Sequence, residues 1–217
     1  MKATAKAHPI QGLIKYHGMR DAERRFPYHD SISVCTAPSH SKTTAEFDEA
    51  LDGDEIVIDG ESVDGRGRER VEMVVDHVRE LADIDAPVRF YSENNFPTNI
   101  GFGSSSSGFA AAAMALVEAA GLDMTRPEIS TVARRGSSSA ARAVTGAFSQ
   151  LDAGMNDEDC RAHRIETDLE DDLRIVAAEV PAFKHTEAAH DEAEASHMFE
   201  ARLAHIHQQM SDMRDAL

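Results

Sequence analysis

The chain has 217 residues, of which 41% are hydrophobic, so it can form one large domain with a buried core, or one domain plus part of a second, and wholesale disorder is excluded. Its formal net charge is −17, and 5 lysines stand against 17 arginines. Because the phosphate backbone of nucleic acid requires a positive surface, this charge excludes general nucleic-acid binding, and a phosphate-bearing ligand would need a local basic site.

The acidic residues are spread along the whole chain, which favours a protein from a high-salt cytoplasm over an ordinary acidic protein. The two cysteines, Cys35 and Cys160, form no CxxC motif and predict free thiols in a reducing compartment. The N-terminus lacks an apolar signal region, and no apolar run reaches the roughly 18 residues of a membrane span. We therefore expect a cytoplasmic protein without a membrane partner.

The first half of the chain predicts strands around one amphipathic helix. Alternating and β-branched residues predict strands over 3–9, 31–37 and 86–92, and 54–63 predicts a hairpin that turns at Asp59–Gly60. A helix is expected over 68–84, with these residues on its apolar face: Val71, Val74, Val75, Val78 and Leu81.

The second half is predominantly helical in pattern. Residues 105–120 are apolar on every side, which predicts a buried helix that ends at Gly121. Two short helices are expected over 126–136 and 138–146, followed by a strand over 173–180 and helical sequence over 190–216. The acidic stretch 165–172 predicts a boundary between a first domain, 1–168, and a second, 169–217. We expect the second domain to be incomplete, because so short a segment cannot bury a core of its own.

A loop rich in glycine and serine precedes the buried helix. Gly101 and Gly103 allow the backbone to approach a ligand closely, and Ser104 to Ser107 lead directly into the helix, whose first turn has unpaired N–H groups with partial positive charge. A strand, a glycine-rich loop and a helix N-terminus together form a general phosphate-binding arrangement. Serines that simply cap the helix are the alternative. Neither a Walker A nor a Rossmann glycine pattern is present.

Three blocks of sequence resemble one family, in its order and spacing. They are "LIKYHGMRD…PYHDSISV" (13–34), "SENNFPT" followed by "GFGSSSSGFAA" (92–111), and "ARRGSSSAARAVTGAF" (133–148). They resemble the mevalonate diphosphate decarboxylases of the GHMP kinase superfamily over roughly residues 3–165. The resemblance implies an α+β GHMP kinase fold, in which a ribosomal-protein-S5-like N-terminal domain is followed by the start of a ferredoxin-like C-terminal domain.

The resemblance implies sites for ATP and Mg²⁺. The residues expected to hold the ATP phosphates are Gly101, Gly103, Ser104, Ser105 and Ser106. Ser105 is also a candidate Mg²⁺ ligand. Asn94 and Asn95 are expected to fix the loop or to approach the adenine.

The same resemblance implies a substrate site and two catalytic residues, Arg142 and Lys15. The expected substrate-binding residues are Lys15, Tyr16, Ser137, Ser139 and Arg142. A planar guanidinium suits a carboxylate or a phosphate, although an isolated arginine or lysine on a helix or strand is more often a surface residue. Asp30, Ser31 and Ser33 are further candidates for the pocket lining. His190 and His197, with Glu194 between them, are expected to be solvated rather than metal-bound.

These features predict ATP-dependent decarboxylation of a phosphorylated mevalonate, by a protein expected to form a homodimer. A GHMP small-molecule kinase and a non-catalytic nucleotide-binding protein are the alternatives. The aspartate of the family's "FDAGPN"-like stretch has no counterpart here, since "LDAGMN" (151–156) falls in another block. We therefore expect the 217 residues to be the N-terminal part of a longer enzyme and to be inactive alone.

The first block departs from the family at one position. Where the family has a second lysine, placed by the resemblance against the terminal phosphate of the substrate, this chain has Met19. Loss of a cation beside a diphosphate is more costly than beside a monophosphate. We therefore expect 5-phosphomevalonate, converted to isopentenyl phosphate, to be preferred over the diphosphate; Met19 in the core, with another basic residue as substitute, is the alternative.

Overall fold

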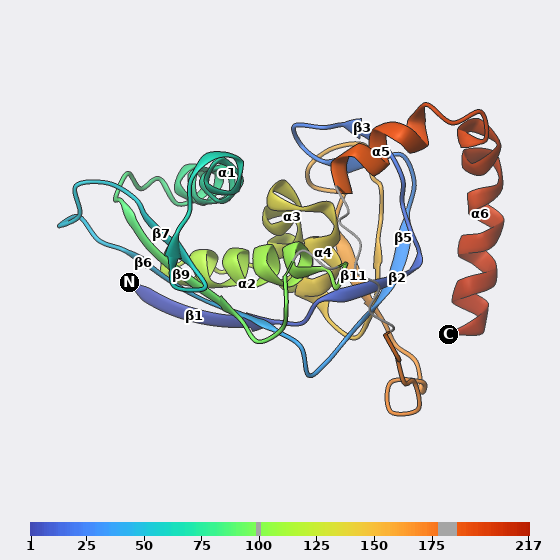
Figure 1. The fold of residues 1–217 in the computed structure, drawn as a ribbon, viewed down its shortest axis with the longest axis horizontal. Coiled ribbons are helices and arrows are strands. Elements are labelled where there is room, and N and C mark those ends of the chain that lie inside the picture. Colours follow the sequence, from blue (N-terminus) through green and yellow to red (C-terminus); the bar gives the residue numbers. More distant parts are fainter. Residues whose placement is uncertain (99–100, 178–185) are drawn as a thin grey trace.

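The computed structural model describes residues 1–98, 101–177 and 186–217, and these form two main sheets and six helices (Figure 1). The five-stranded sheet has the order β1 (Lys2–Ala7), β6 (Ser41–Phe47), β9 (Val88–Asn94), β7 (Glu55–Ile58) and β8 (Glu61–Ser62). Its neighbouring strands pair antiparallel except for β7 and β9, which pair in parallel. The antiparallel four-stranded sheet has the order β11 (Ala162–Ile165), β10 (Phe148–Leu151), β5 (Ser31–Cys35) and β2 (Ile10–Ile14). β3 (Met19–Asp21) and β4 (Phe26–Pro27) form a short ribbon.

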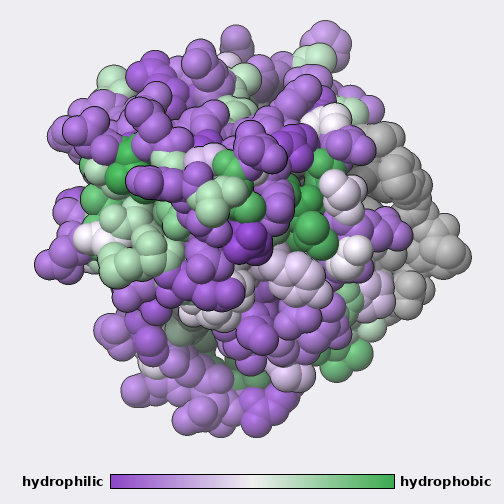
Figure 2. Space-filling model, turned by 90° about the vertical axis from the view of Figure 1, so that its left-hand side faces the viewer, coloured by the Kyte–Doolittle hydropathy of each residue, from purple (hydrophilic) through white to green (hydrophobic). Residues whose placement is uncertain are grey.

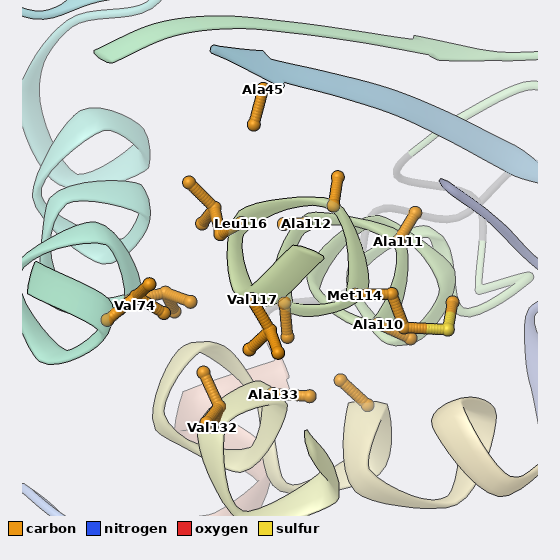
Figure 3. Packing of buried hydrophobic residues seen from close by; sticks show 14 of the residues in the cluster. Ala45, Val74, Ala110, Ala111, Ala112, Met114, Leu116, Val117, Val132 and Ala133 are labelled. Carbon is orange, nitrogen blue, oxygen red and sulfur yellow. The ribbon is translucent and has the colours of Figure 1, made fainter. Parts of the chain in front are cut away.

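Helix α2 (Ser104–Ala119) is the centre of the core, as its apolar sequence predicts. It packs on β1 and β6 of the larger sheet on one side and on α1 (Gly65–Ala82), α3 (Arg126–Gly136) and α4 (Ser138–Thr145) on the other. Figure 3 shows its alanines and Leu116 pointing into these contacts. Small side chains allow close approach: a Cβ added to Gly136 would lie 2.1 Å from Cδ1 of Phe109. The mixture of helices and antiparallel-rich sheets confirms the expected α+β fold.

Helix α1 follows the predicted pattern with one exception. Val71, Val74, Val75 and Val78 are all buried, whereas Leu81 is 47% exposed. The helix ends one residue later, at Ala82, and its C-cap Asp83 has a left-handed backbone conformation. The expected burial of Leu81 was wrong because its side chain lies in the final turn, where the helix leaves the core.

The region after the first domain differs from the predictions. Residues 173–177 are exposed and form no strand, and the remainder of the predicted strand, 178–180, lies outside the described residues. The expected helical stretch is divided into α5 (Thr186–Glu194) and α6 (Phe199–Ala216). Ile206 and Met210 of α6 bury their side chains with Ile32 of β5. The domain division at residue 168 stays a prediction.

The acidic surface leads to a prediction about salt. Hydrophilic residues cover most of the face shown in Figure 2, and the net charge of −17 produces self-repulsion that dissolved ions screen. We expect the melting temperature to rise between dilute buffer and about 1 M KCl. A melting temperature that stays constant or falls, measured by circular dichroism, would contradict the adaptation to high salt. Over the described residues, no helix is long and apolar enough to cross a membrane.

Candidate functional site

The glycine-rich loop packs closely against β2 where it leads into α2. Gly103 is the N-cap residue, with φ 76° and ψ 34°, so the helix begins at Ser104. None of the described serine side chains caps the helix, which contradicts the alternative that the serines are simply capping residues. The Ser106 hydroxyl donates to the Gly103 carbonyl (2.6 Å) and accepts the Ile10 N–H (3.2 Å). A Cβ on Gly103 would lie 3.2 Å from the Ile10 carbonyl oxygen in a backbone conformation that favours glycine. Ser106 therefore connects the loop to β2.

The hydroxyls of Ser104 and Ser105 are available to a ligand. Neither hydroxyl makes a hydrogen bond to another described residue, and Ser105 is exposed. They lie in the first turn of α2, where N–H groups lack helical acceptors. Of the predicted phosphate-binding serines, these two thus have the free groups, whereas Ser106 is engaged within the protein.

The side chains of Asn94 and Asn95 hydrogen-bond to other residues of the protein. The Asn94 side chain donates to Asp59 Oδ2 (3.0 Å) and accepts the Ser41 hydroxyl (2.5 Å). The Asn95 side chain accepts the His40 N–H (2.6 Å) and donates to the Pro38 carbonyl (3.3 Å). Neither asparagine is among the described residues that line the cavity. These contacts favour the expectation that the asparagines fix the loop over the expectation that they approach a base.

A cavity of about 530 Å³ lies beside this helix start and brings together most of the predicted site. The predicted residues that line it are Lys15, Tyr16, Gly101, Gly103, Ser104, Ser105, Ser106, Ser137, Ser139 and Arg142. Its cationic side chains are Lys15, Arg25, Arg66, Arg70 and Arg142. No Asp or Glu is among the described lining residues, although the whole chain has 39 of them. In so acidic a protein, this segregation of charge fits the cavity to an anionic ligand.

Arg142 is the most unusual group in the cavity. It lies in the last turn of α4, is 3% exposed, and neither its Nε nor its Nη1 has a hydrogen-bond partner among the described residues. Burial lowers the pKa of this guanidinium to about 10, and the nearby Tyr16 partly opposes the shift. The side chain therefore stays charged at neutral pH. An ionised side chain buried without a carboxylate partner is costly, which indicates that an anion completes the site.

Two loops present the remaining predicted groups. Ser137 and Ser139 lie at the start of α4 and their hydroxyls are 2.9 Å apart. Lys15 and Tyr16 follow β2, and the ring centroid of Tyr16 is 5.5 Å from the guanidinium carbon of Arg142. Met19 is half-buried and lines the cavity, so the alternative that it faces the core is wrong.

Several lining residues were not expected from the sequence. They are His17, Arg25, Arg66, Arg70 and His190. The spacing of Arg66 and Arg70, one helical turn apart, was a usable signal, since it predicts two guanidinium groups on one face of α1. Burial, followed by the positive charges of Arg202 and neighbouring histidines, lowers the pKa of His17, which favours its neutral form.

The remaining candidates lie elsewhere. Asp30 accepts the Ala153 N–H (2.8 Å) and pairs with Arg214 (3.6 Å). Ser31 and Ser33 are fully buried in β5. None of these three is among the described cavity-lining residues. Within the described ranges, no group of three or more His, Cys, Asp or Glu side chains is placed to hold a metal ion.

The fold and the cavity define an α+β domain with a group of cationic side chains beside a helix N-terminus. The chain matches the diphosphomevalonate decarboxylase-like N-terminal domain over residues 7–162, and it belongs to this family. It is similar to the phosphomevalonate decarboxylase of Haloferax volcanii, with 76% identity over 100% of this chain and 67% of that protein. It is also similar to the diphosphomevalonate decarboxylase of Ganoderma lucidum, with 34% identity over 68% of this chain and 40% of that protein.

Solved structures show the same fold. Mevalonate diphosphate decarboxylase from Staphylococcus aureus superposes with a TM-score of 0.88 and 30% identity, covering 100% of this chain and 67% of that chain. A complex of MDDEF with MVAPP, AMPPCP and magnesium gives a TM-score of 0.87 and 28% identity, covering 100% and 68%. These structures support the expected GHMP-type fold, and the Haloferax relative agrees with the expected adaptation to salt.

Proposed function

We propose that the protein containing this chain is an ATP-dependent decarboxylase that converts 5-phosphomevalonate to isopentenyl phosphate. The observation that carries the proposal is the cavity: among its described lining residues no Asp or Glu occurs, and it contains Arg142, whose Nε and Nη1 have no hydrogen-bond partner there. The Haloferax relative is a phosphomevalonate decarboxylase, and the chain spans 67% of its length. A substrate with a carboxylate and a phosphate matches this charge at both ends.

The residues present fit ATP and Mg²⁺. Gly101 and Gly103 allow the loop to approach phosphates, and Ser104 and Ser105 offer free hydroxyls and N–H groups at the N-terminus of α2. ATP with Mg²⁺, when bound, supplies the phosphoryl group that makes the 3-hydroxyl of the substrate a leaving group. A family complex with AMPPCP and magnesium supports this assignment.

The chain's own residues bind and orient the substrate. Arg142 offers a planar fork to the carboxylate or to the phosphate, and Lys15 and Tyr16 lie beside it. Ser137 and Ser139 add hydroxyl donors at the start of α4. Fixed cations of this kind also stabilise negative charge on a transferring phosphoryl group. The homodimer and the cytoplasmic location stay predictions.

The first prediction for this function concerns the substrate. Because Met19 lines the cavity with no charge to offer, we expect the complete protein to have a higher kcat/KM for 5-phosphomevalonate than for the diphosphate. Met19→Lys should shift the ratio toward the diphosphate by roughly tenfold or more, as for one charge-assisted hydrogen bond. The measurement is steady-state CO₂ release with each substrate.

Met19→Leu is the matched control, since it changes shape without adding charge. A higher kcat/KM for the diphosphate in the wild type would overturn the substrate assignment. It would mean that Arg25 and Arg66, which also line the cavity, supply the cation that Met19 lacks. ADP formation without CO₂ release would instead support the GHMP small-molecule kinase.

The second prediction concerns nucleotide binding by the chain itself. Ser105→Ala should weaken the binding of ATP·Mg by roughly three- to tenfold, because it removes a free hydroxyl at the N-terminus of α2. Isothermal titration calorimetry on both proteins measures the effect. Ser107→Ala is not a suitable control because its hydroxyl bonds to Ser41. Ser211→Ala is suitable, since Ser211 is an exposed helical serine of α6 that does not line the cavity. Equal affinities for wild type and Ser105→Ala would remove this hydroxyl from the phosphate site.

A further inference from the structure

The loop that carries Lys15 and Tyr16 is held by residues more than 170 positions away. The Gly18 N–H donates to His190 Nδ1 (3.1 Å), and the Met19 N–H donates to Glu194 Oε1 (2.8 Å). The Lys15 carbonyl accepts a guanidinium N–H of Arg202 (2.7 Å). The backbone of this loop is therefore fixed at three points by α5 and the start of α6, and Figure 1 shows α5 lying beside β3.

His190 also orients the side chain of Tyr16. The two rings are stacked, with centroids 5.3 Å apart and an interplanar angle of 8°. The Arg142 guanidinium lies over the same tyrosine ring, 5.5 Å from its centroid. His190 and Arg142 both line the cavity, so one tyrosine ring connects a histidine of α5 to the buried arginine.

The contact between residues 15–19 and the segment of α5 and α6 is tightly packed. Gly18 has φ +75°, and a Cβ there would lie 2.8 Å from Cγ of Glu194 and 2.9 Å from Cζ of Phe199. The Phe199 ring in turn makes an edge contact with Tyr28, with centroids 5.2 Å apart. A displacement of α5 would therefore move the backbone of residues 15–19.

We propose that His190 is a positioning residue for the phosphorylated substrate. Through its bond to Gly18 and its stacking on Tyr16, it holds the loop of residues 15–19 in the geometry that presents Lys15 and Tyr16 to the ligand beside Arg142. Glu194 and Arg202 support the same loop. This role rests on the proposed function for the identity of the ligand, whereas the loop geometry is independent of it.

Two substitutions separate the two contacts of His190. His190→Phe keeps a flat ring for stacking on Tyr16 and removes the acceptor for the Gly18 N–H. His190→Asn keeps an acceptor oxygen and removes the stacking ring. His197→Asn is the matched control, because His197 is an exposed histidine in the same part of the chain.

Amide hydrogen exchange of Gly18, measured by NMR on this chain, tests the geometry. His190→Phe should accelerate exchange at Gly18 roughly tenfold, as expected for loss of one hydrogen bond, and His190→Asn and His197→Asn should leave it near the wild-type rate. Melting temperatures that agree within a few degrees would show that the fold is intact. Unchanged exchange at Gly18 in His190→Phe would overturn the proposal.

Ligand binding by the complete protein tests the consequence. Without ATP, the Kd for 5-phosphomevalonate should rise roughly tenfold in each His190 variant and stay constant in His197→Asn, while the Kd for ATP·Mg should change in none of them. An unchanged Kd for 5-phosphomevalonate in His190→Phe, despite faster Gly18 exchange, would overturn the positioning role. Wild-type protein that binds the substrate but releases no CO₂ would refute the decarboxylase function and leave the role of His190 supported by these two measurements.

Discussion

Arg142→Met is expected to lower the kcat/KM of the complete enzyme by about 10²- to 10³-fold and, at the same time, to stabilise the unliganded protein. Truncating one partner of a buried charge pair costs about 2–5 kcal/mol in binding, which gives that loss if the substrate is the partner. The guanidinium is 3% exposed with two unpartnered nitrogens, so the free protein has a desolvated charge that methionine removes. Replacement of buried charge by a well-packed apolar side chain stabilises proteins by up to about 1–4 kcal/mol.

The two effects are measured separately. CO₂ release gives kcat/KM, and urea denaturation of the unliganded chain gives the free energy of unfolding. Arg142→Lys is the matched control, since it keeps the charge and loses the planar fork, and we expect most of the activity loss without the gain in stability. An Arg142→Met variant that is both active and less stable would mean that the arginine has a structural partner instead of an anionic ligand.

Arg134→Met should have the opposite effect on stability, lowering the free energy of unfolding by about 3–5 kcal/mol. This second buried arginine donates to the Cys160 carbonyl (3.1 Å), to the Arg24 carbonyl and to Asp157 (2.5 Å). Its guanidinium carbon is also 4.4 Å from the centroid of the Phe26 ring. Methionine fills part of the volume but leaves the two carbonyls without their donor, which is costly for buried groups.

Urea denaturation of the 217-residue chain measures this effect. Arg135→Met is the matched control: Arg135 contacts the same Asp157 (3.0 Å) but is more exposed, so its loss should cost less than about 1 kcal/mol. A small change for Arg134→Met would show that its bonds do not contribute to stability. The comparison of Arg134 with Arg142 thus contrasts a buried arginine whose nitrogens have partners with one that has two unpartnered nitrogens, which the proposed ligand would contact.

Periodicity predicted the elements whose buried faces are apolar. Helices α1 and α2 and the hairpin of β7 and β8 lie where their patterns indicate. Strand β6 was not predicted, because its buried face has Ser41 and Thr43 as well as Ala45. The Ser41 hydroxyl bonds to Ser107 of α2 (2.7 Å), and the Thr43 hydroxyl bonds to Ser92 (2.9 Å), its partner on the adjacent strand β9. A polar strand of this kind gives no hydrophobic signal, since its burial depends on partners far away in the sequence.

The site was predictable where its residues are grouped in motifs. The loop before α2, the serines before α4, and Arg142 all line the cavity as the family resemblance implies. Asn94 and Asn95 belong to the same motif, yet their side chains bond to the framework. His190 could not be found in this way, because its contact with Gly18 is formed only when α5 packs on the loop. Residues 173–177, the described part of the strand predicted over 173–180, show the converse error, since Ile175 and Val176 pair with no described strand and are exposed.

The hydroxyl of Ser106 has a consequence for the relative placement of the two reactants. It bonds to Gly103 in the loop proposed to bind the nucleotide and to Ile10 in the strand that leads to Lys15 and Tyr16. The proposed nucleotide site and the proposed substrate site are therefore both hydrogen-bonded to Ser106. The distance between them is set by the folded chain before either ligand binds. Holding two reactants at a fixed spacing can replace the entropy cost of their encounter, which corresponds to effective molarities of about 10⁵ M or more in well-oriented systems. We expect part of the rate acceleration of this enzyme to originate in these two hydrogen bonds of Ser106.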